Sequence, residues 1–480
     1  MIPDTVVARD SGHVPGAAAP VEGVLVDHYE RMLAQRYGQR RWILAMDVLA
    51  AATPLVADLR RLGSGDVFVI AGSRGTGPVP DDAASVVLGT GGVGIMDGIR
   101  RFQQALGDLP PDVARAVDAF DPDGTAKVIG MPFAEHPEVA GRGVHGARPQ
   151  RWQALDDKTT VDALWDAAGV VRAPSLVVPA EPAALRTASE RLDGGSGVVW
   201  VADNRAGWHG GATGLRWVTS PDQAEQAAAF LAQRADQVRV MPFLDGIPCS
   251  IHGMVFDDLT AVFRPCEMVV LRRPGRSDLF YAGMATTWDP APAGREEMRS
   301  AARRVGDHLR ATVGYRGIFT IDGVMTAGGF LPTELNPRYG AAVNLLAVAA
   351  DLPLYLLHLA VIAEPGAPWS PRRLEHMIVT AADANRGVRG VITVARTLAE
   401  QEVALRLEGH DVVVAGSQPA DVTLATGPAA MGAALSLTVH PARRPPGSSI
   451  APVTAAVLSW ADRRWRLGLG PLEPAPDVTR

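Results

Sequence analysis

Residues 317–340 read GIFTIDGVMTAGGFLPTELNPRYG, two apolar stretches joined by TAGG. This pattern predicts a β-hairpin. Side chains alternate between the two faces of a strand, so Glu334, Asn336 and Arg338 share one face. On the other arm, Asp322 can lie opposite Glu334. Unpaired polar groups cost roughly 1 to 3 kcal/mol in an apolar setting, so this face either binds something or is a solvated edge strand.

The polar residues of the hairpin have the donor chemistry of a magnesium site. Two neighbouring carboxylates, Asp322 and Glu334, would raise each other's pKa unless a cation neutralises them. With the amide oxygen of Asn336 they form an oxygen-only ligand set, which Mg²⁺ prefers. Because Mg²⁺ is commonly held by few protein oxygens together with substrate phosphates, the sequence favours a site for magnesium and a nucleotide.

Length and composition limit the class of protein. A chain of 480 residues, 47% hydrophobic and 20% charged, is typical of a globular protein with several domains. No apolar run reaches the ~18 residues of a transmembrane helix and the N-terminus lacks a signal-peptide pattern, so we expect a cytoplasmic location and no membrane partner. A net charge of −6 without long basic runs argues against nucleic acid as a partner. Cys249 and Cys266 are expected to be buried free thiols.

The first part of the chain alternates strand and helix patterns. Residues 40–46 and 65–72 favour buried strands, and residues 48–63 between them favour a helix that Gly63 would end. This order predicts a parallel α/β unit. The glycines of residues 89–94 fit the G-x-G-x-x-G dinucleotide fingerprint, but they follow a third strand rather than the first, so we interpret them as a tight turn.

The second part predicts helices among mostly antiparallel strands. The expected elements include a glycine-rich loop at 205–214, a strand with a break at 238–246, one strand at 259–273, one long apolar helix at 342–363, and strands and a last helix in a tail without an assignable motif.

The hairpin resembles the metal-binding hairpin of ATP-grasp enzymes, in which an acid on one strand is followed by an E-x-N-x-R strand. The order of elements upstream also fits, over about residues 150–360. The stretch MPFLDGIPCSIHG at 241–253 and the long leader before Lys158 are similar to actinobacterial natural-product peptide ligases that carry a pre-ATP-grasp domain.

The resemblance implies an α/β (α+β) fold with a nucleotide clasped between two subdomains. The expected domains are a parallel α/β pre-ATP-grasp domain (1–150), a first ATP-grasp subdomain with a glycine-rich lid (151–235), a second with the hinge and the metal hairpin (236–365), and a C-terminal α/β extension (366–480).

The resemblance also implies roles for single residues. Glu334 would bridge two Mg²⁺ ions, for which Mn²⁺ could substitute, with Asp322 completing one site and Asn336 the other. Arg338 would lie beside the transferred phosphoryl group or the substrate carboxylate, either of which suits a planar bidentate donor. Lys158 matches the first phosphate-contacting lysine of the family.

The broken strand at 238–246 can serve as an adenine-binding hinge. The Pro242 carbonyl suits the amino group of adenine, and the Leu244 N–H can meet a ring nitrogen. Asp245 could accept hydrogen bonds from the ribose hydroxyls, and Phe243 either stacks there or belongs to the core.

One position departs from the family pattern. Where a second lysine normally precedes the glycine-rich loop, this chain has Val201 and Ala202. Arg205 or His209 in the loop could replace the missing cation, or the nucleotide site is weakened.

Further residues near the predicted site are candidates for substrate contact. Ser250 and His252 share a strand face, and Asn344 follows the hairpin. Arg272 and Arg273 end a strand before a turn and are candidates for binding phosphate or carboxylate; Arg273 is assigned a catalytic role with Arg338.

The leading functional hypothesis is an ATP- and Mg²⁺-dependent ligase that joins a carboxylate to an amine through an acyl phosphate, in natural-product biosynthesis. The expected partners are small molecules, an acid and an amine of the amino acid or peptide class, and a homodimer is left open. The alternatives are an ATP-grasp enzyme that forms an ester or a thioester, and a degenerate nucleotide-binding protein without turnover.

Overall fold

The computed structural model describes residues 20–477 except 93, 208, 410 and 441–446. Its N-terminal unit is built on a four-stranded sheet in the order β3-β2-β1-β4. The strands are β1 (Trp42–Val48), β2 (Val67–Ser73), β3 (Ala84–Val87) and β4 (Lys127–Gly130). All three pairings are parallel, which confirms the α/β prediction for this part of the chain.

Helices cover this parallel sheet. They are α1 (Pro20–Tyr37), α2 (Thr53–Arg61), α3 (Ile95–Gly107) and α4 (Pro111–Phe120). Gly63 follows α2 with a φ of 77°, the left-handed conformation that ends helices, as predicted. The glycines from Gly89 onward connect the third strand of the chain to α3, so their position also agrees with a turn.

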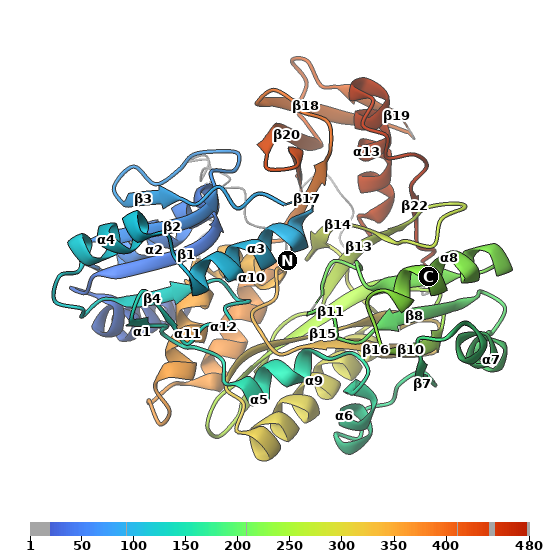
Figure 1. Cartoon of the computed structure of the whole chain (residues 1–480), viewed down its shortest axis with the longest axis horizontal. Helices are drawn as coiled ribbons and strands as arrows, with labels where there is room; N and C mark the ends of the chain where they lie inside the picture. The colour runs from blue at the N-terminus through green and yellow to red at the C-terminus, as the bar shows by residue number, and fades with distance from the viewer. Residues whose placement is uncertain (1–19, 93, 208, 410, 441–446, 478–480) are drawn as a thin grey trace.

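A second, smaller unit follows in the sequence, on the right of Figure 1. Its four-stranded antiparallel sheet has the order β7-β10-β8-β9, formed by β7 (Leu176–Pro179), β8 (Val198–Ala202), β9 (Leu215–Val218) and β10 (Gln237–Pro242). The helices of this part are α5 (Gln150–Gln153), α6 (Val161–Ala167), α7 (Pro182–Leu192) and α8 (Pro221–Ala232). Ser220 caps α8, since its hydroxyl accepts a hydrogen bond from the Gln223 N–H at 3.3 Å.

The central sheet of the molecule has twelve strands. Its main path is β16-β15-β11-β13-β14-β17-β21-β20-β18-β19, with β12 and β22 paired to its sides. The first group of strands is β11 (Ile247–Val255), β12 (Thr260–Val262), β13 (Cys266–Arg272), β14 (Phe280–Ala285), β15 (Gly317–Thr326) and β16 (Gly329–Asn336). Helix α9 (Pro292–Val313) packs on β11, β12 and β16.

Two predicted elements are each divided in the structure. The single strand predicted at 259–273 is two strands, β12 and β13, since Pro265 between them lacks the N–H that a ladder needs. The single helix predicted at 342–363 is α10 (Val343–Ala350) and α11 (Leu354–Ala363), which meet at 109°. Asp351 takes a left-handed φ of 47° at the bend and Pro353 follows it, so the helix ends there.

Among the described residues, no single helix is long and apolar enough to span a membrane; only the bent pair α10 and α11 meets those criteria, when its two halves are taken together.

The tail continues the central sheet rather than forming a sheet of its own. Its strands are β17 (Val388–Val394), β18 (Gln401–Glu408), β19 (Asp411–Val414), β20 (Val422–Ala429), β21 (Gly432–Val439) and β22 (Glu473–Pro474). Strand β17 pairs with β14, so the proposed boundary at residue 366 divides one continuous sheet. Its helices are α12 (Pro371–Ala384) and α13 (Ala451–Trp465).

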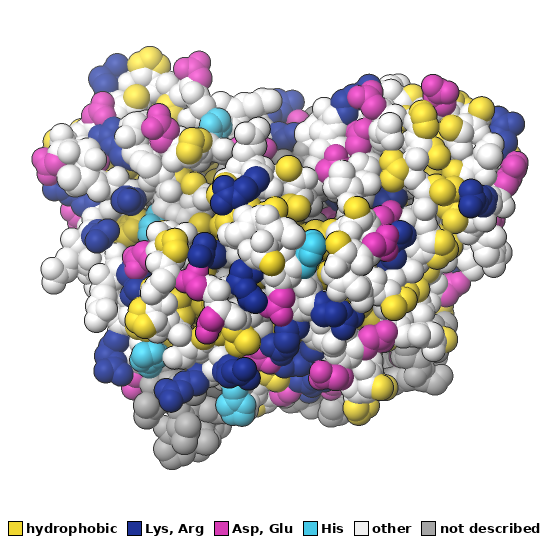
Figure 2. Space-filling model, turned by 90° about the horizontal axis from the view of Figure 1, so that it is seen from below, with side chains coloured by type: hydrophobic (Ala, Val, Ile, Leu, Met, Phe, Trp, Pro, Cys, Tyr) yellow, Lys and Arg dark blue, Asp and Glu magenta, His cyan; other side chains and the backbone are white. Residues whose placement is uncertain are grey.

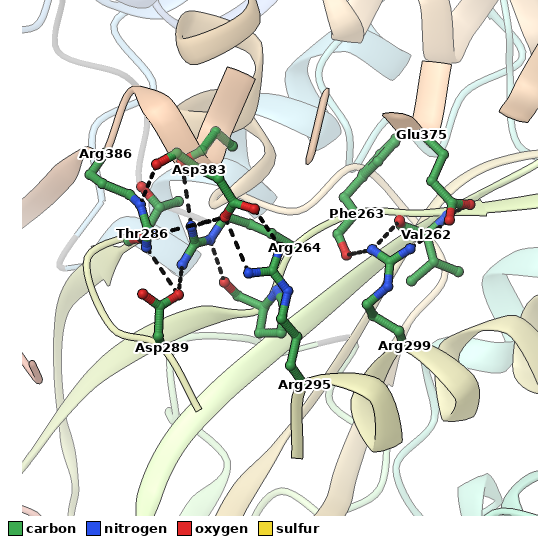
Figure 3. Close-up of polar contacts among 12 residues, drawn as sticks. Val262, Phe263, Arg264, Thr286, Asp289, Arg295, Arg299, Glu375, Asp383 and Arg386 are labelled. Atoms are coloured by element: carbon green, nitrogen blue, oxygen red, sulfur yellow. Dashed lines mark hydrogen bonds and ion pairs between the residues drawn. The ribbon is translucent and has the colours of Figure 1, made fainter. Parts of the chain in front are cut away.

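A network of arginines around one buried member, Arg264, attaches α12 to the central sheet (Figure 3). Arg264, which is fully buried, pairs with Asp289 at 2.6 Å and with Asp383 at 2.5 Å. Arg386 also pairs with Asp289, at 3.0 Å. Beside them, the Arg299 guanidinium donates to the Val262 carbonyl at 2.9 Å.

Charges of both signs also mix on the molecular surface. Figure 2 shows basic side chains lying among acidic ones on the face seen from below. Cys249 and Cys266 are buried and unpaired, as predicted.

Candidate active site

A cavity of about 270 Å³ lies against the central sheet. All three parts of the fold contribute to its walls: Phe133 from the N-terminal unit, the loop residues His209 to Ala212 from the smaller unit, and β11, β15 and β16 from the central sheet. The predicted hairpin therefore forms part of a built cavity: β16 is the edge strand of the central sheet, but its polar face lines this cavity.

The floor of the cavity consists of side chains in register. Ser250 on β11 pairs with Asp322 on β15, which pairs with Glu334 on β16. Opposite residues in antiparallel strands share a face, so these three form one polar row. A second row lies two residues along each strand and consists of His252, Thr320 and Asn336.

The Asp322 carboxylate is held in place from both sides. The Ser250 hydroxyl donates to Asp322 Oδ1 at 2.5 Å, and the Asn336 amide donates to Asp322 Oδ2 at 2.8 Å. Burial and then the nearby Glu334 carboxylate raise the pKa of Asp322 above its ordinary value. A cation at this point would stabilise the ionised form.

Lys158 lies on the same polar row. Its ammonium is 3.2 Å from Glu334 Oε1 and donates to the His209 carbonyl at 2.7 Å. His209 Nε2 donates to the Ala202 carbonyl at 3.0 Å, which leaves its Nδ1 facing Lys158 at 3.4 Å. Burial, followed by the charge of Lys158, lowers the pKa of His209 to about 4, so this ring is neutral at pH 7.

Arg338 is buried at the far end of the hairpin. It pairs with the carboxylate of Asp156, and it donates to Asn336 Oδ1 at 2.5 Å. The Phe133 ring lies 4.9 Å from its guanidinium carbon. Arg148 also reaches Asp156, at 3.1 Å. Asp156 therefore fixes Arg338 as a cation that faces the cavity.

The hinge residues Pro242, Phe243 and Leu244 line the opposite end of the cavity. Phe243 does so while stacking on Trp217, with ring centroids 4.3 Å apart. Asp245 is not a lining residue; its carboxylate pairs with Arg272 at 2.7 Å.

Besides Asp245, three predicted site residues are not brought to the cavity. Arg205 turns away and pairs with Asp236 at 2.9 Å, so it does not replace the missing lysine. Arg273 pairs with Asp278 at 2.7 Å and donates to the Leu469 carbonyl at 3.0 Å, because alternation along β13 sends its neighbour Arg272 to the cavity instead. Asn344 lies in α10 and does not line the cavity.

The position of the missing lysine is occupied by apolar lining. Val199 and Val201 of β8 face the cavity, and Asp203 beyond them accepts the backbone N–H groups of Asp236 and Gln237. Among the described lining residues, the permanent cations are Lys158, Arg272 and Arg338.

Some contributors could not be found from the sequence pattern. Buried Arg239 makes a bidentate pair with Asp162, at 2.7 and 3.0 Å, and donates to the Thr333 carbonyl at 3.0 Å. It therefore ties the smaller unit to the residue before Glu334. No local motif marks Asp156, Phe133 or Arg239, since their partners are distant in the chain. The one signal in the sequence is at Arg239, an arginine within an otherwise apolar strand.

The donor set fits a magnesium ion completed by phosphate oxygens. No group of three or more His, Cys, Asp or Glu side chains that could hold a metal occurs among the described residues. Asp322 and Glu334 with the Asn336 amide supply only oxygen ligands, and Asn336 Oδ1 keeps one lone pair beyond its bond to Arg338. A site with few protein oxygens leaves coordination positions for other ligands, which suits Mg²⁺ bound together with a polyphosphate.

Comparison with known protein families finds no match, and comparison with curated proteins finds none either. Solved structures do share the fold. The biotin carboxylase domain of 2-oxoglutarate carboxylase from Hydrogenobacter thermophilus, determined with MgADP and bicarbonate, has a TM-score of 0.53 at 12% identity and covers 84% of this chain and 86% of its own.

Two further structures are similar over most of this chain. Pyruvate carboxylase from Rhizobium etli has a TM-score of 0.53 at 15% identity, over 84% of this chain and 36% of its own. N5-carboxyaminoimidazole synthase from Aspergillus clavatus, determined with ADP and aminoimidazole ribonucleotide, has a TM-score of 0.50 at 12% identity, over 89% of this chain and all of its own.

Proposed function

Because the chain has the ATP-grasp fold, we propose that it is an ATP- and Mg²⁺-dependent ligase that joins a carboxylate to an amine through an acyl phosphate. One observation carries this proposal: Asp322, Glu334, Lys158 and Arg338 converge on one cavity from two strands and two loops. Similar structures were determined with ADP or MgADP, which supports nucleotide and magnesium as the ligands of this cavity.

Different residues of the cavity would bind the metal, the nucleotide and the substrate in such a reaction. Magnesium held by Asp322, Glu334 and Asn336 would supply charge neutralisation of the nucleotide phosphates. The Lys158 ammonium, which pairs with Glu334 in the empty cavity, would instead bind a phosphate oxygen of the nucleotide. The hinge at 242–244 would hold the base. Arg338 would orient the substrate carboxylate toward the γ-phosphorus. Positioning and electrostatics suffice here, so no nucleophilic side chain is required.

Turnover tests this proposal directly. Purified protein with Mg²⁺ and ATP is screened against carboxylic acids and amino acids with hydroxylamine present, which traps acyl phosphates as hydroxamates. We expect acid-dependent release of ADP and formation of a hydroxamate. A wide panel that gives neither product would contradict the proposal and favour a nucleotide-binding protein without turnover, a role to which the absent second lysine points.

Substitution of Glu334 tests the assignment of the metal ligands. Glu334→Gln keeps the shape of the side chain but removes one of the two paired carboxylates, so we expect ADP release to fall at least a hundredfold. Thr326→Val, at the turn of the same hairpin and outside the residues that line the cavity, is the control and should retain activity. The mass of the product separates an amide ligase from an enzyme that forms an ester or a thioester.

The finer parts of the hypothesis rest on the sequence resemblance. A role in natural-product biosynthesis is supported by the hinge stretch and the long leader before Lys158. A homodimer and a cytoplasmic location remain proposals too, and light scattering would measure the oligomeric state.

A further inference from the structure

We infer that the cavity contains a compartment for the amine substrate, with His252 Nε2 as the acceptor that holds a neutral amine. This inference rests on the proposed function and deepens it by naming the residue and the chemistry on the side of the nucleophile.

Strand register separates this compartment from the nucleotide. Along β11 the cavity-facing residues are Pro248, Ser250 and His252, in that order away from the hinge. Ser250 belongs to the row of the carboxylate pair, so His252 lies on the far side of that row from the base-binding end. Two residues of strand amount to about 7 Å, so His252 lies beyond the row of the carboxylate pair rather than within it.

His252 carries an unused polar atom. Its side chain is only 1% exposed, and we assign the tautomer in which its Nδ1–H donates to the Thr320 hydroxyl at 2.9 Å, which leaves Nε2 as an acceptor. Its Nε2 is buried without a hydrogen-bond partner among the described residues. An unpaired buried nitrogen costs roughly 1 to 3 kcal/mol, and a ligand that bonds to it removes that cost. The other cavity-lining residue with such an atom is Arg272, which lies at the hinge end and can only donate.

The surroundings of His252 suit an amine without charge. The acidic residues among the described lining residues are Asp322 and Glu334, both assigned to the metal, so an ammonium group has no free carboxylate to pair with. Donors toward an anion are already supplied by Arg338. What the nucleophile lacks is an acceptor, and a neutral imidazole nitrogen provides one.

The walls of the compartment are small and apolar. A Cβ at Gly340 would lie 2.3 Å from the Thr320 hydroxyl and 3.5 Å from the His252 ring, so only glycine keeps this corner open. Ala341 and Ala342 follow it, and Phe133 covers the side next to Arg338. We therefore expect an amine whose substituent next to the nitrogen is apolar.

The chemistry of the step balances with the groups named. The amine nitrogen attacks the carbonyl carbon of the acyl phosphate and forms the C–N bond. The bond between that carbon and the bridging oxygen of the phosphate breaks. Inorganic phosphate leaves with the bonding electron pair and takes the proton that the nitrogen loses. His252 contributes by orienting one N–H of the amine, so that the nitrogen lone pair faces the acyl carbon.

Two half-reactions measured on one variant test this inference. In His252→Leu we expect hydroxamate formation within twofold of wild type, because concentrated hydroxylamine needs no positioning, but at least a tenfold loss of amide formation with the amino acids that wild type uses. His252→Gln, which places a polar group near the position of Nε2, should recover part of the loss. His136→Leu removes a half-buried histidine outside the cavity and should change neither rate.

The outcomes separate this inference from the proposed function. Wild type that forms no hydroxamate overturns the proposed function and the inference with it. Wild type that forms hydroxamate, together with a His252→Leu variant that loses both products equally or loses neither, overturns the inference alone. Leucine and phenylalanine should outpace aspartate and lysine as amines, and the reverse order would contradict the apolar compartment.

Discussion

Lys158 and Glu334 form an ion pair in the cavity, with 3.2 Å between Nζ and Oε1. An anion that binds beside Lys158 would compete with Glu334 for its ammonium group. Glu334 lies in a half-buried row beside Asp322, so without Lys158 two carboxyl groups would face each other. In the proposed complex Lys158 would turn to a phosphate group, and Glu334 would hold the metal instead. The lysine would then have one partner in the empty cavity and another in the filled one.

Replacing Lys158 should weaken nucleotide binding. Lys158→Met removes one charge-assisted hydrogen bond to phosphate, worth about 1.5 to 3 kcal/mol, so the Kd for MgATP should rise about ten- to a hundredfold. Calorimetric titration measures this change. The other lysine of the chain, Lys127, is exposed on β4, and Lys127→Met should leave the Kd unchanged. Equal Kd values for both variants would remove Lys158 from the phosphate site.

Glu267 gives the fold a dependence on pH. It is 1% exposed and accepts the Ser449 hydroxyl at 2.6 Å and the Ile450 N–H at 2.8 Å, at the start of α13. Burial raises its pKa from 4.5 to about 7. Between these two values the folded chain holds a proton that the unfolded chain has released, so this contribution to stability falls as the pH rises through the window.

The variant Glu267→Gln should remove this dependence. Relative to the variant, wild type should lose roughly 3 kcal/mol of unfolding free energy between pH 4.5 and pH 7. Urea unfolding of both proteins at several pH values measures the difference. If the unfolding free energies of the two proteins changed with pH in parallel, Glu267 would be ionised throughout the window.

At the scale of elements, a buried arginine attaches α12 to the central sheet. Arg264→Met leaves Asp289 and Asp383 without their buried partner, so we expect a loss of about 3 to 5 kcal/mol in unfolding free energy. Arg276, whose side chain is 58% exposed, pairs with Asp278 on the surface, and Arg276→Met should cost about 1 kcal/mol or less. Thermal and urea denaturation compare the two. Similar losses would mean that the Arg264 network adds little to stability.

The local patterns of the elements explain which of them could be predicted. The hairpin and the parallel sheet could be predicted because they depend on alternation and turn residues, which lie within a few residues of one another in the sequence. The bend between α10 and α11 was missed because an unbroken apolar run hides the boundary that Pro353 sets. Arg273 was chosen over Arg272 because the face of a strand can be assigned only once its partners are known.

At the scale of the whole molecule, the cavity exists only when distant parts of the chain meet. Phe133, His209 and Arg338 come from three units, and no local pattern in the sequence contains that arrangement. The carboxylate pair could be predicted because both members belong to one hairpin. The acid that holds Arg338, Asp156, could not, since 182 positions separate the two residues.

Nucleotide binding should therefore stabilise the molecule as a unit. MgATP at a hundred times its Kd should add about 2.7 kcal/mol to the unfolding free energy. Differential scanning calorimetry measures the rise in Tm, which a chelator should reduce if magnesium takes part. Glu334→Gln should show a smaller rise than wild type. A rise that is equal with and without magnesium would contradict the assignment of the carboxylate pair.

The pairing of β14 with β17 restricts how this protein can be shortened. The two strands align at Met284 with Arg389 and at Ala285 with Val388. A chain that stopped near residue 365 would keep every residue of the cavity except Ala475, yet it would leave β14 with an unpaired, apolar edge. Such an edge recruits strands from other molecules. We therefore expect gene fusions or truncations placed at this point to yield aggregates.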